Sequence, residues 1–323
     1  MPPSPEMEKA WLSEYLFLRE NIYGGDCDAI VRDAVEPFVR ACAERGWADR
    51  WFFIRYSERG FHVRLRFHGE RDVLEREVRP ALRRHLAALY PDLQEGYPEP
   101  IGSGGEGVTH VAEAVYEPET ERYGGPDGVL LAEELFHRSS EAALALLARV
   151  HPTERSGRLG KGLLAMVVLV HAFHPERTAA AEFARQYGIN YLRSMVPDDE
   201  RRSAWLDAFG SGFEQQAGNL TAYVDEAWER LATGEELSEA LDRWRDDLAE
   251  VRVRFRELFD AGRLLREGGA IDTWEFAVAA IVPSYVHMMN NRLGVSIQEE
   301  SYLAYLIHRA LAVPAPAGAE ATA

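Results

Sequence analysis

The segment FHVRLRF, at positions 61 to 67, combines basic and apolar residues at a spacing that could bind an anion. Successive side chains of a β-strand point to opposite faces, so one face should carry His62, Arg64, Arg66 and His68. Neighbouring Arg side chains pair bidentately with carboxylate or phosphate and stay charged when partly desolvated. The pattern therefore indicates an anion site, while a half-buried strand with a solvated polar face remains the alternative.

A second candidate is YEPETERYGG, from Tyr116 to Gly125, where Glu119 and Arg122 stand three residues apart before a glycine turn. Loops at strand ends often carry binding residues. Alternatively, Glu119 and Arg122 pair with each other on the surface, an interaction worth about 0 to 1 kcal/mol.

The third candidate is PSYVHMMNNRLG, from Pro283 to Gly294. Helical spacing brings Ser284, His287 and Asn291 to a common face. The imidazole of His287 suits proton transfer near neutral pH, and the alternative is a hydrogen-bonded core histidine.

Other familiar chemistries lack their motifs. His171 and His174 could share a metal, but no third ligand follows at a useful spacing. Cys27 and Cys42 form neither a CxxC pair nor a zinc site, and no glycine-rich phosphate loop, GxSxG or HExxH occurs. We therefore expect no metal and no cofactor.

The elements that must position these residues differ along the chain. The first part alternates strand-like and helix-like periods. Its expected elements are strands at Trp11–Arg19, Trp51–Tyr56, Phe61–Phe67 and Val108–Tyr116, helices at Asp28–Arg45 and Val73–Leu89, and a surface loop at Pro91–Gly107.

From Gly128 onward the periods are helical. The last helix is the best defined, because Gly294 ends its predecessor and Ser296 forms a capping box with Glu299. Pro283 should kink or break the helix that contains it. These patterns predict an α+β fold, with an N-terminal mixed or antiparallel sheet and flanking helices followed by a mainly helical C-terminal part.

The expected organisation is a sheet-containing part at 1–127, a helical part at 128–313 packed on it as one catalytic unit, and a disordered tail at 314–323. Of the 323 residues 46% are hydrophobic and 28% charged, as in folded proteins, and the net charge of −17 argues against nucleic-acid binding. The best apolar run, Leu163 to Phe173, is too short to span a bilayer, and the N-terminus lacks signal-peptide features. We expect a cytoplasmic protein without a membrane segment.

In this order, WFFIRY, HVRLRF, ETERYGG and HMMNNRLG resemble the C-terminal domain of class I lantibiotic dehydratases and the thiopeptide-type biosynthesis proteins. The resemblance runs from about Trp11 to Leu311. It implies a stand-alone enzyme that removes glutamate from glutamylated Ser or Thr of a ribosomal precursor peptide, leaving dehydroalanine or dehydrobutyrine. A full-length dehydratase also has a large N-terminal domain that transfers glutamate from glutamyl-tRNA, and no counterpart of it is expected here.

The family's elimination residues are an Arg-x-Arg pair, a Glu and Arg three apart, and a late His. By resemblance these are Arg64 and Arg66, Glu119 and Arg122, and His287. The arginines would hold the glutamyl group and stabilise negative charge, His287 would transfer a proton, and Glu119 would orient an Arg or share the acid/base role. Expected substrate-binding residues are His62, Arg55, Ser284, Tyr285 and Asn291. The pocket is expected where FHVRLRF and ETERYGG face the helix that follows Pro283.

Two other functions remain open. Some family members are pyridine synthases, which join two dehydroalanines by a formal [4+2] cycloaddition and release the leader peptide; Tyr285, Ser284 and His287 would then orient the reacting amide. Alternatively, the chain is a noncatalytic subunit that binds a precursor peptide along a sheet edge. The expected partners are the precursor peptide, leader and core, with a separate glutamylating dehydratase subunit or a second copy of the chain.

Overall fold

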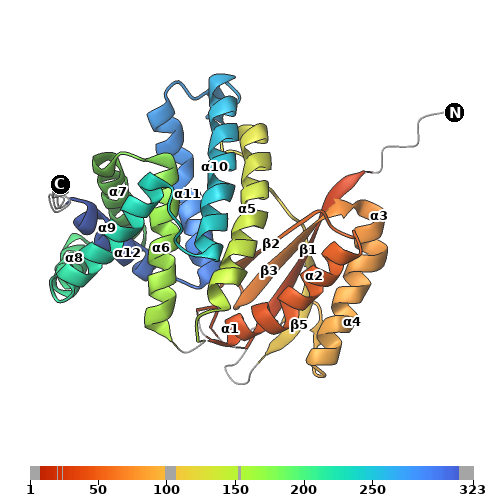
Figure 1. Cartoon of the computed structure of the whole chain (residues 1–323). Coiled ribbons are helices and arrows are strands. Elements are labelled where there is room, and N and C mark those ends of the chain that lie inside the picture. The colour runs from red at the N-terminus through yellow and green to blue at the C-terminus, as the bar shows by residue number, and fades with distance from the viewer. Residues whose placement is uncertain (1–7, 20, 24, 99–106, 152–153, 313–323) are drawn as a thin grey trace. The chain divides into compact units, whose positions relative to one another are not determined.

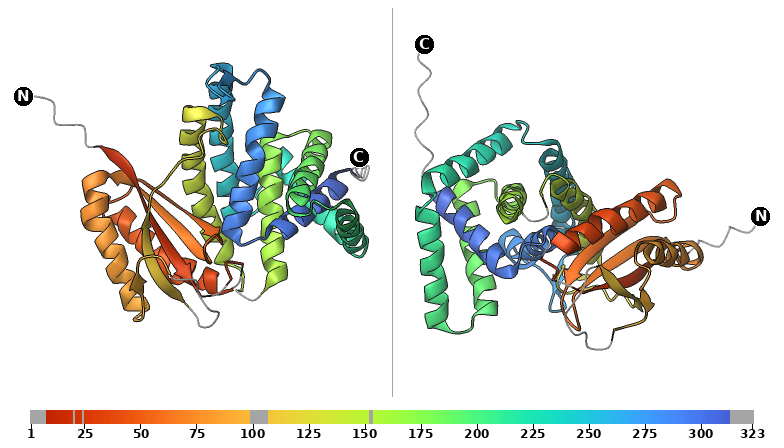
Figure 2. Two further views of the ribbon diagram at one scale, coloured as in Figure 1. Left: turned by 180° about the vertical axis from the view of Figure 1, so that it is seen from behind. Right: turned by 90° about the horizontal axis from the view of Figure 1, so that it is seen from below.

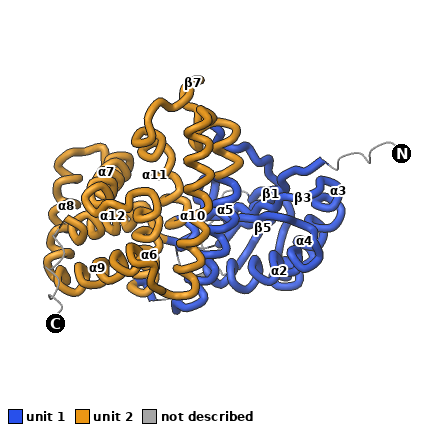
Figure 3. Tube along the Cα trace, turned by 45° about the horizontal axis from the view of Figure 1, so that its top comes forward, with its two compact units in different colours: residues 1–120, 132–155, 291–294 blue, residues 121–131, 156–290, 295–323 orange. Residues whose placement is uncertain are grey.

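The computed structural model describes residues 8–19, 21–23, 25–98, 107–151 and 154–312. The chain forms two compact units (Figure 3): unit 1 holds residues 1–120, 132–155 and 291–294, and unit 2 holds residues 121–131, 156–290 and 295–323. The division falls within α5 (Gly125–Leu147) and near the end of α11 (Trp274–Leu293). The expected disordered tail at 314–323, and positions 99–106 of the expected loop, lie outside the described residues.

Unit 1 is built on a five-stranded sheet with the strand order β2-β3-β1-β5-β4. Its strands are β1 (Lys9–Leu18), β2 (Arg50–Tyr56), β3 (His62–Glu70), β4 (Gln94–Glu95) and β5 (Val108–Ala114). All neighbours pair antiparallel except β4, which runs parallel to β5. The mixed sheet confirms the predicted fold class, and β2 and β3 lie close to the strands expected at positions 51 to 56 and 61 to 67.

Helices cover one face of this sheet (Figures 1 and 2). They are α1 (Gly25–Ile30), a π-helical turn (Val31–Val35), α2 (Glu36–Glu44), α3 (Arg71–Val73), a second π-helical turn (Leu74–Val78) and α4 (Arg79–Leu89). The Phe38 ring of α2 lies 5.7 Å from the Phe67 ring of β3. The apolar residues of β3 therefore face the helices, which leaves His62, Arg64 and Arg66 on the opposite face.

The outer edge of β2 is closed by side chains rather than by another strand. The Asn291 amide accepts a hydrogen bond from the Arg55 backbone N–H and donates one to the Arg55 carbonyl, both at 2.8 Å. The Phe53 N–H donates to Ser140 Oγ at 3.3 Å, and His137 Nδ1 lies 3.1 Å from the Trp51 carbonyl oxygen. These three side chains satisfy backbone groups that an edge strand leaves open.

Unit 2 is helical, as predicted. Besides parts of α5 and α11 it contains α6 (Arg155–Phe173), α7 (Arg177–Met195), α8 (Asp199–Glu214), α9 (Ala217–Thr233), α10 (Glu239–Asp260), α12 (Ile297–Ala312) and a small hairpin of β6 (Leu265–Arg266) and β7 (Gly269–Ala270). Trp244 of α10 is fully buried and donates its indole N–H to the Ala165 carbonyl of α6 at 3.2 Å.

α6 is longer than the apolar run seen in the sequence. By length and composition it could cross a membrane, but 61% of its most apolar 18-residue window is buried inside the protein. A helix that is apolar all round and packed inside a helical unit is also what a core requires. The helix is therefore weak evidence for membrane insertion.

Of the two outcomes expected at Pro283, a kink or a break, the break does not occur: α11 runs unbroken from Trp274 to Leu293 with Pro283 inside it. Proline removes one backbone hydrogen bond, and the bonds and packing of the remaining turns keep this helix continuous. The predicted stop is confirmed, because Gly294 has φ +68° and its N–H donates to the Asn291 carbonyl, while the Val295 N–H donates to the Asn290 carbonyl.

Candidate functional site

Two clusters contain most of the residues predicted to do chemistry, one in each unit. The first is the arginine face of unit 1, formed by His62, Arg64 and Arg66 of β3. Strand register places Tyr15 of β1 opposite Arg64. The Arg64 guanidinium carbon lies 3.4 Å from the Tyr56 ring centre and 4.9 Å from that of Tyr15, so aromatic rings hold the cation.

Arg66 is the more deeply placed arginine, with only 6% of its surface exposed. Its guanidinium carbon lies 4.4 Å from the Tyr116 ring centre and 5.1 Å from that of Phe52. Its Nε is buried and has no hydrogen-bond partner among the residues that the structure describes, and burial lowers the pKa of its guanidinium. Burial on this scale does not fit a solvated strand face, the alternative that the sequence had left open.

Neither Arg64 nor Arg66 forms an ion pair with a carboxylate of the residues that the structure describes. The contrast with the neighbouring strand is direct: buried Arg55 on β2 lies 2.6 Å from an Asp28 carboxylate oxygen. A buried charge is normally paired, because an uncompensated one is costly. The arginine face thus carries positive charge that no carboxylate of the described residues neutralises.

His62 fixes one arginine of this face. Its Nδ1 lies 2.7 Å from the Gly60 carbonyl oxygen, and Arg64 Nε donates to His62 Nε2 at 3.2 Å. The ring is consequently neutral, with its proton on Nδ1. Burial chiefly, with a contribution from the Arg64 charge, lowers the pKa of His62 to about 4. His62 therefore orients Arg64 and does not exchange protons near neutral pH.

The second cluster lies in unit 2, and we call it the histidine cluster: Arg122, Tyr191, Ser284, His287 and Glu300. Arg122 Nε donates to Ser284 Oγ at 2.9 Å, and its guanidinium also hydrogen-bonds the Tyr191 hydroxyl. The Tyr191 ring lies 5.3 Å from the His287 ring. The cluster thus holds the Arg122 cation against two neutral hydroxyl groups, and the ring of Tyr191 also lies against the imidazole of His287.

His287 is held by a buried carboxylate. Its Nδ1 lies 3.0 Å from Glu300 Oε2, and the side chains are 18% and 0% exposed. Burial raises the pKa of Glu300 well above its ordinary value, against an opposing effect of Arg122. A histidine with an orienting carboxylate is a common arrangement for proton transfer.

Local backbone geometry fixes these side chains. Gly124, two residues after Arg122, has φ +85°, and a Cβ there would lie 2.7 Å from Ile281 Cδ1. Ser296 caps α12: its N–H donates to Glu299 Oε2 at 2.9 Å and its Oγ accepts from the Glu299 N–H at 3.4 Å. That capping box sets the helix start so that the next residue, Glu300, points inward toward α11.

The other predicted residues have different surroundings. Glu119 is exposed in the segment after β5, in unit 1, whereas Arg122 belongs to unit 2. The polar groups of Asn291 are occupied by the Arg55 backbone, and the Arg55 side chain bonds Asp28, Ile22 and Arg292. These contacts fit a structural role better than substrate binding.

Tyr285 also fits a packing role. It is 2% exposed, its ring stacks on Tyr123 at 5.9 Å, and the Phe173 and Phe255 rings lie within 6.5 Å. Burial raises the pKa of its hydroxyl, which has no hydrogen-bond partner among the described residues. Both properties are typical of a core residue.

Sequence reasoning missed Tyr191 and Glu300. Glu300 left a signal, because it shares a helix face with Leu303, Ala304 and Ile307, all buried, and a carboxylate on an apolar face is unusual. Tyr191 left none, since an aromatic residue on a helix usually belongs to a core.

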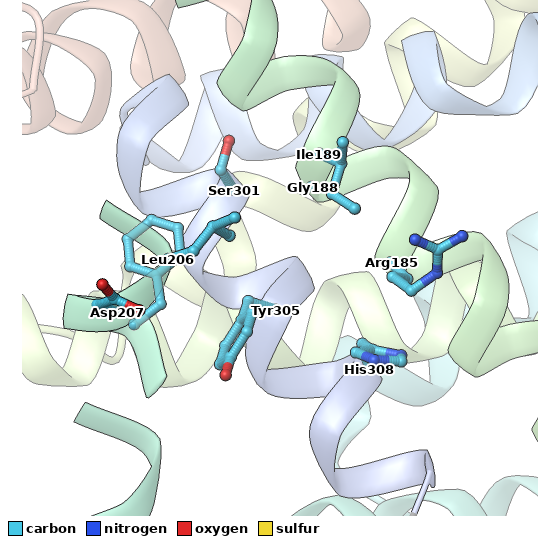
Figure 4. Close-up of a pocket in the computed structure, with 9 residues that line it drawn as sticks. Arg185, Gly188, Ile189, Leu206, Asp207, Ser301, Tyr305 and His308 are labelled. Carbon is cyan, nitrogen blue, oxygen red and sulfur yellow. The ribbon is translucent and has the colours of Figure 1, made fainter. Parts of the chain in front are cut away.

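A cavity of about 280 Å³ lies elsewhere in unit 2, among α7, α8 and α12 (Figure 4). Its lining includes Arg185, Ile189, Leu206, Tyr305 and His308, and none of the predicted site residues. Among the described residues no group of three His, Cys, Asp or Glu side chains could hold a metal ion.

Comparisons with known proteins agree on one family. A family model described as the C-terminal part of lantibiotic biosynthesis dehydratases matches residues 16–311. The structure of TsrL is 19% identical with a TM-score of 0.71, over 94% of each chain. TbtD, a pyridine synthase from thiomuracin biosynthesis, is 18% identical with a TM-score of 0.68, over 94% of this chain and 97% of that one.

The tRNA-dependent lantibiotic dehydratase MibB from Microbispora sp. 107891 is 23% identical with a TM-score of 0.64, and the match covers 96% of this chain but 28% of MibB. No curated protein sequence matches the chain. Likeness at these identities shows a common fold.

Proposed function

Because the chain belongs to the lantibiotic biosynthesis dehydratase C-terminal family, a family of peptide-modifying proteins, we propose that it eliminates glutamate from glutamylated Ser or Thr of a ribosomal precursor peptide. The product is dehydroalanine from Ser and dehydrobutyrine from Thr. The reaction breaks bonds in the peptide substrate and needs no cofactor.

One observation carries this proposal: the arginine face holds two cations without carboxylate partners among the described residues, and Arg66 is buried. A substrate with its own carboxylate supplies the missing countercharge, and guanidinium groups bind carboxylates bidentately. A glutamyl group carries such a carboxylate. The charge of the bound substrate then offsets the cost of keeping Arg66 desolvated.

The reaction moves one proton and breaks two bonds. A base removes the Cα proton, and the electron pair of the C–H bond forms the Cα=Cβ double bond. The Cβ–O bond breaks at the same time. Glutamate leaves with the former Ser or Thr side-chain oxygen as one of the two oxygens of its carboxylate. We assign the proton transfer to His287, and stabilisation of the developing negative charge to Arg122. Glu119, exposed after β5, is assigned an accessory role in binding.

Mass spectrometry tests the proposal. The full chain is incubated with a glutamyl-Ser precursor peptide and, separately, with a peptide that already carries two dehydroalanines. We expect loss of glutamate from the first peptide, abolished by Arg66→Ala and by His287→Ala. Arg76→Ala is the matched control, because the Arg76 side chain is 78% exposed and its ion pair with Asp72 lies at the surface.

The alternatives predict other products. Release of the leader with a six-membered nitrogen ring from the second peptide identifies a pyridine synthase, the activity named for TbtD. Binding of both peptides without any product identifies a noncatalytic recruitment subunit. Either result contradicts glutamate elimination.

The chain acts in the cytoplasm on the leader and core of its precursor peptide, after a separate glutamylating subunit has acted. Copurification of that subunit with the chain tests the first partner. The molar mass of the purified chain in solution tests whether a second copy binds.

A further inference from the structure

Glu300 is a carboxylate in a place where a carboxylate is costly. It lies in the first turn of α12 and is 0% exposed. Removing a carboxylate from water costs several kcal/mol unless good partners compensate it, and an apolar residue of similar volume is often as stable. A contribution to the stability of the fold therefore does not explain why a carboxylate occupies this buried position.

The groups around Glu300 point to its role. Its two carboxylate oxygens lie 3.0 Å and 3.3 Å from His287 Nδ1. The other charged group that acts on it is Arg122, and the titratable Tyr191 of α7 lies against the His287 ring. α11 contributes the uncharged Ser284 beside Arg122. Among the described residues, the groups that act on Glu300 thus include the imidazole of His287 and the cation of Arg122.

From this geometry we propose that Glu300 is the positioning residue of His287: it fixes the ring through Nδ1 and shares one proton with it. The inference deepens the proposed function, because it rests on His287 as the group that transfers the proton.

The pair has two protonation states that matter. With the extra proton it is an imidazolium beside a carboxylate, or equally a neutral imidazole beside a carboxylic acid, and these two descriptions have one macroscopic pKa. After losing that proton it is a carboxylate that accepts a hydrogen bond from Nδ1–H, which leaves the Nε2 lone pair as the base. The negative charge of Glu300 makes that base stronger than a buried imidazole alone.

Titration of the His287 imidazole by NMR tests this without any substrate. In the full chain with ¹⁵N-labelled histidine, His287→Gln assigns the signal. We expect Glu300→Gln to lower the His287 pKa by at least about 1 unit, because the amide keeps a hydrogen-bond acceptor but loses the charge. Glu299→Gln is the matched control, since it neutralises the adjacent carboxylate and retains a capping side chain.

An unchanged His287 pKa in Glu300→Gln overturns the inference. If that variant does not fold, the wild-type chain still decides the matter: a low-field Nδ1 proton signal that broadens as the pair titrates supports the shared proton, and a ring that titrates like an exposed histidine contradicts it.

The kinetic arm uses the glutamyl-Ser peptide. We expect Glu300→Gln to lower the elimination kcat by about 10- to 100-fold and to shift the acid limb of its pH profile to lower pH, with partial rescue by Glu300→Asp. A merely structural role would lower the rate without moving the limb. If the wild-type chain eliminates no glutamate, the proposed function fails while the NMR result on the pair stands or falls by itself.

Discussion

At the scale of single residues, the two clusters differ in how their charges are balanced. In unit 2 the positive charge of Arg122 lies near a buried carboxylate and is bonded by neutral hydroxyls. In unit 1 the Arg64 and Arg66 cations lie against tyrosine and phenylalanine rings. An aromatic ring stabilises a cation less strongly than a carboxylate does. The arginine face therefore binds an incoming anion more strongly than it would if carboxylates already paired its two arginines.

Because no carboxylate of the described residues pairs with Arg66, we expect a neutral substitution there to reduce activity without reducing stability. Arg66→Met removes the charge that would pair with the substrate carboxylate and retains much of the volume. We therefore expect kcat/KM for elimination to fall by at least about 100-fold, as when one partner of a buried charge pair is lost. The melting temperature should stay level or rise, because a buried charge without a carboxylate partner has gone. Product formation by mass spectrometry and thermal unfolding measure the two effects. A fall in stability together with an intact rate would refute the assignment.

His62 predicts a dependence of stability on pH. Its pKa in the folded chain is about 4, below the value of 6.5 for an unperturbed histidine. The unfolded chain therefore binds the proton first, so stability falls as the pH drops from 6.5 toward 4, by about 3 kcal/mol in all. Denaturant unfolding at several pH values should show a smaller loss in His62→Gln than in the wild type, while His151→Gln, at an exposed position, should behave as the wild type.

At the scale of helices and strands, the start of α12 links folding to the site. The capping box of Ser296 with Glu299 fixes where the helix begins and thereby where Glu300 points. We expect Ser296→Ala to cost about 1 kcal/mol of unfolding free energy. Ser238→Ala is a matched control, because Ser238 precedes α10 without a side-chain capping bond. Equal losses in chemical denaturation would show that the capping bond contributes nothing.

Periodicity predicted the elements well where one face of an element is apolar. The β2–β3 hairpin, the alternation of β3 and the capping box of α12 all follow from local spacing. The closure of the β2 edge did not, because Asn291 meets Arg55 across 236 residues and no local pattern encodes that contact. For the same reason the sequence did not reveal the contact between Asn291 and Arg55, nor the role of Glu300, whose partner His287 lies on another helix.

At the scale of the whole molecule, charge is the dominant property. The net charge of −17 opposes the approach of a polyphosphate, whose binding depends on Lys and Arg. We expect no saturable tRNA binding at about 0.15 M salt, in a filter-binding assay, up to micromolar concentrations. A protein of matching size and positive net charge serves as the control. A salt-sensitive complex with tRNA would show a basic surface that the overall charge conceals.

The closed edge of β2 also governs how copies of the chain behave toward one another. A seven-residue strand with open backbone groups is a template on which a second molecule can add a strand, and such pairing seeds aggregation. Here three side chains, from His137, Ser140 and Asn291, occupy those groups. Loss of any one of these side chains reopens part of the strand edge, so we expect aggregation of the variant to increase with protein concentration. We therefore expect these three residues to keep the protein soluble at high expression levels, a role that does not depend on its activity.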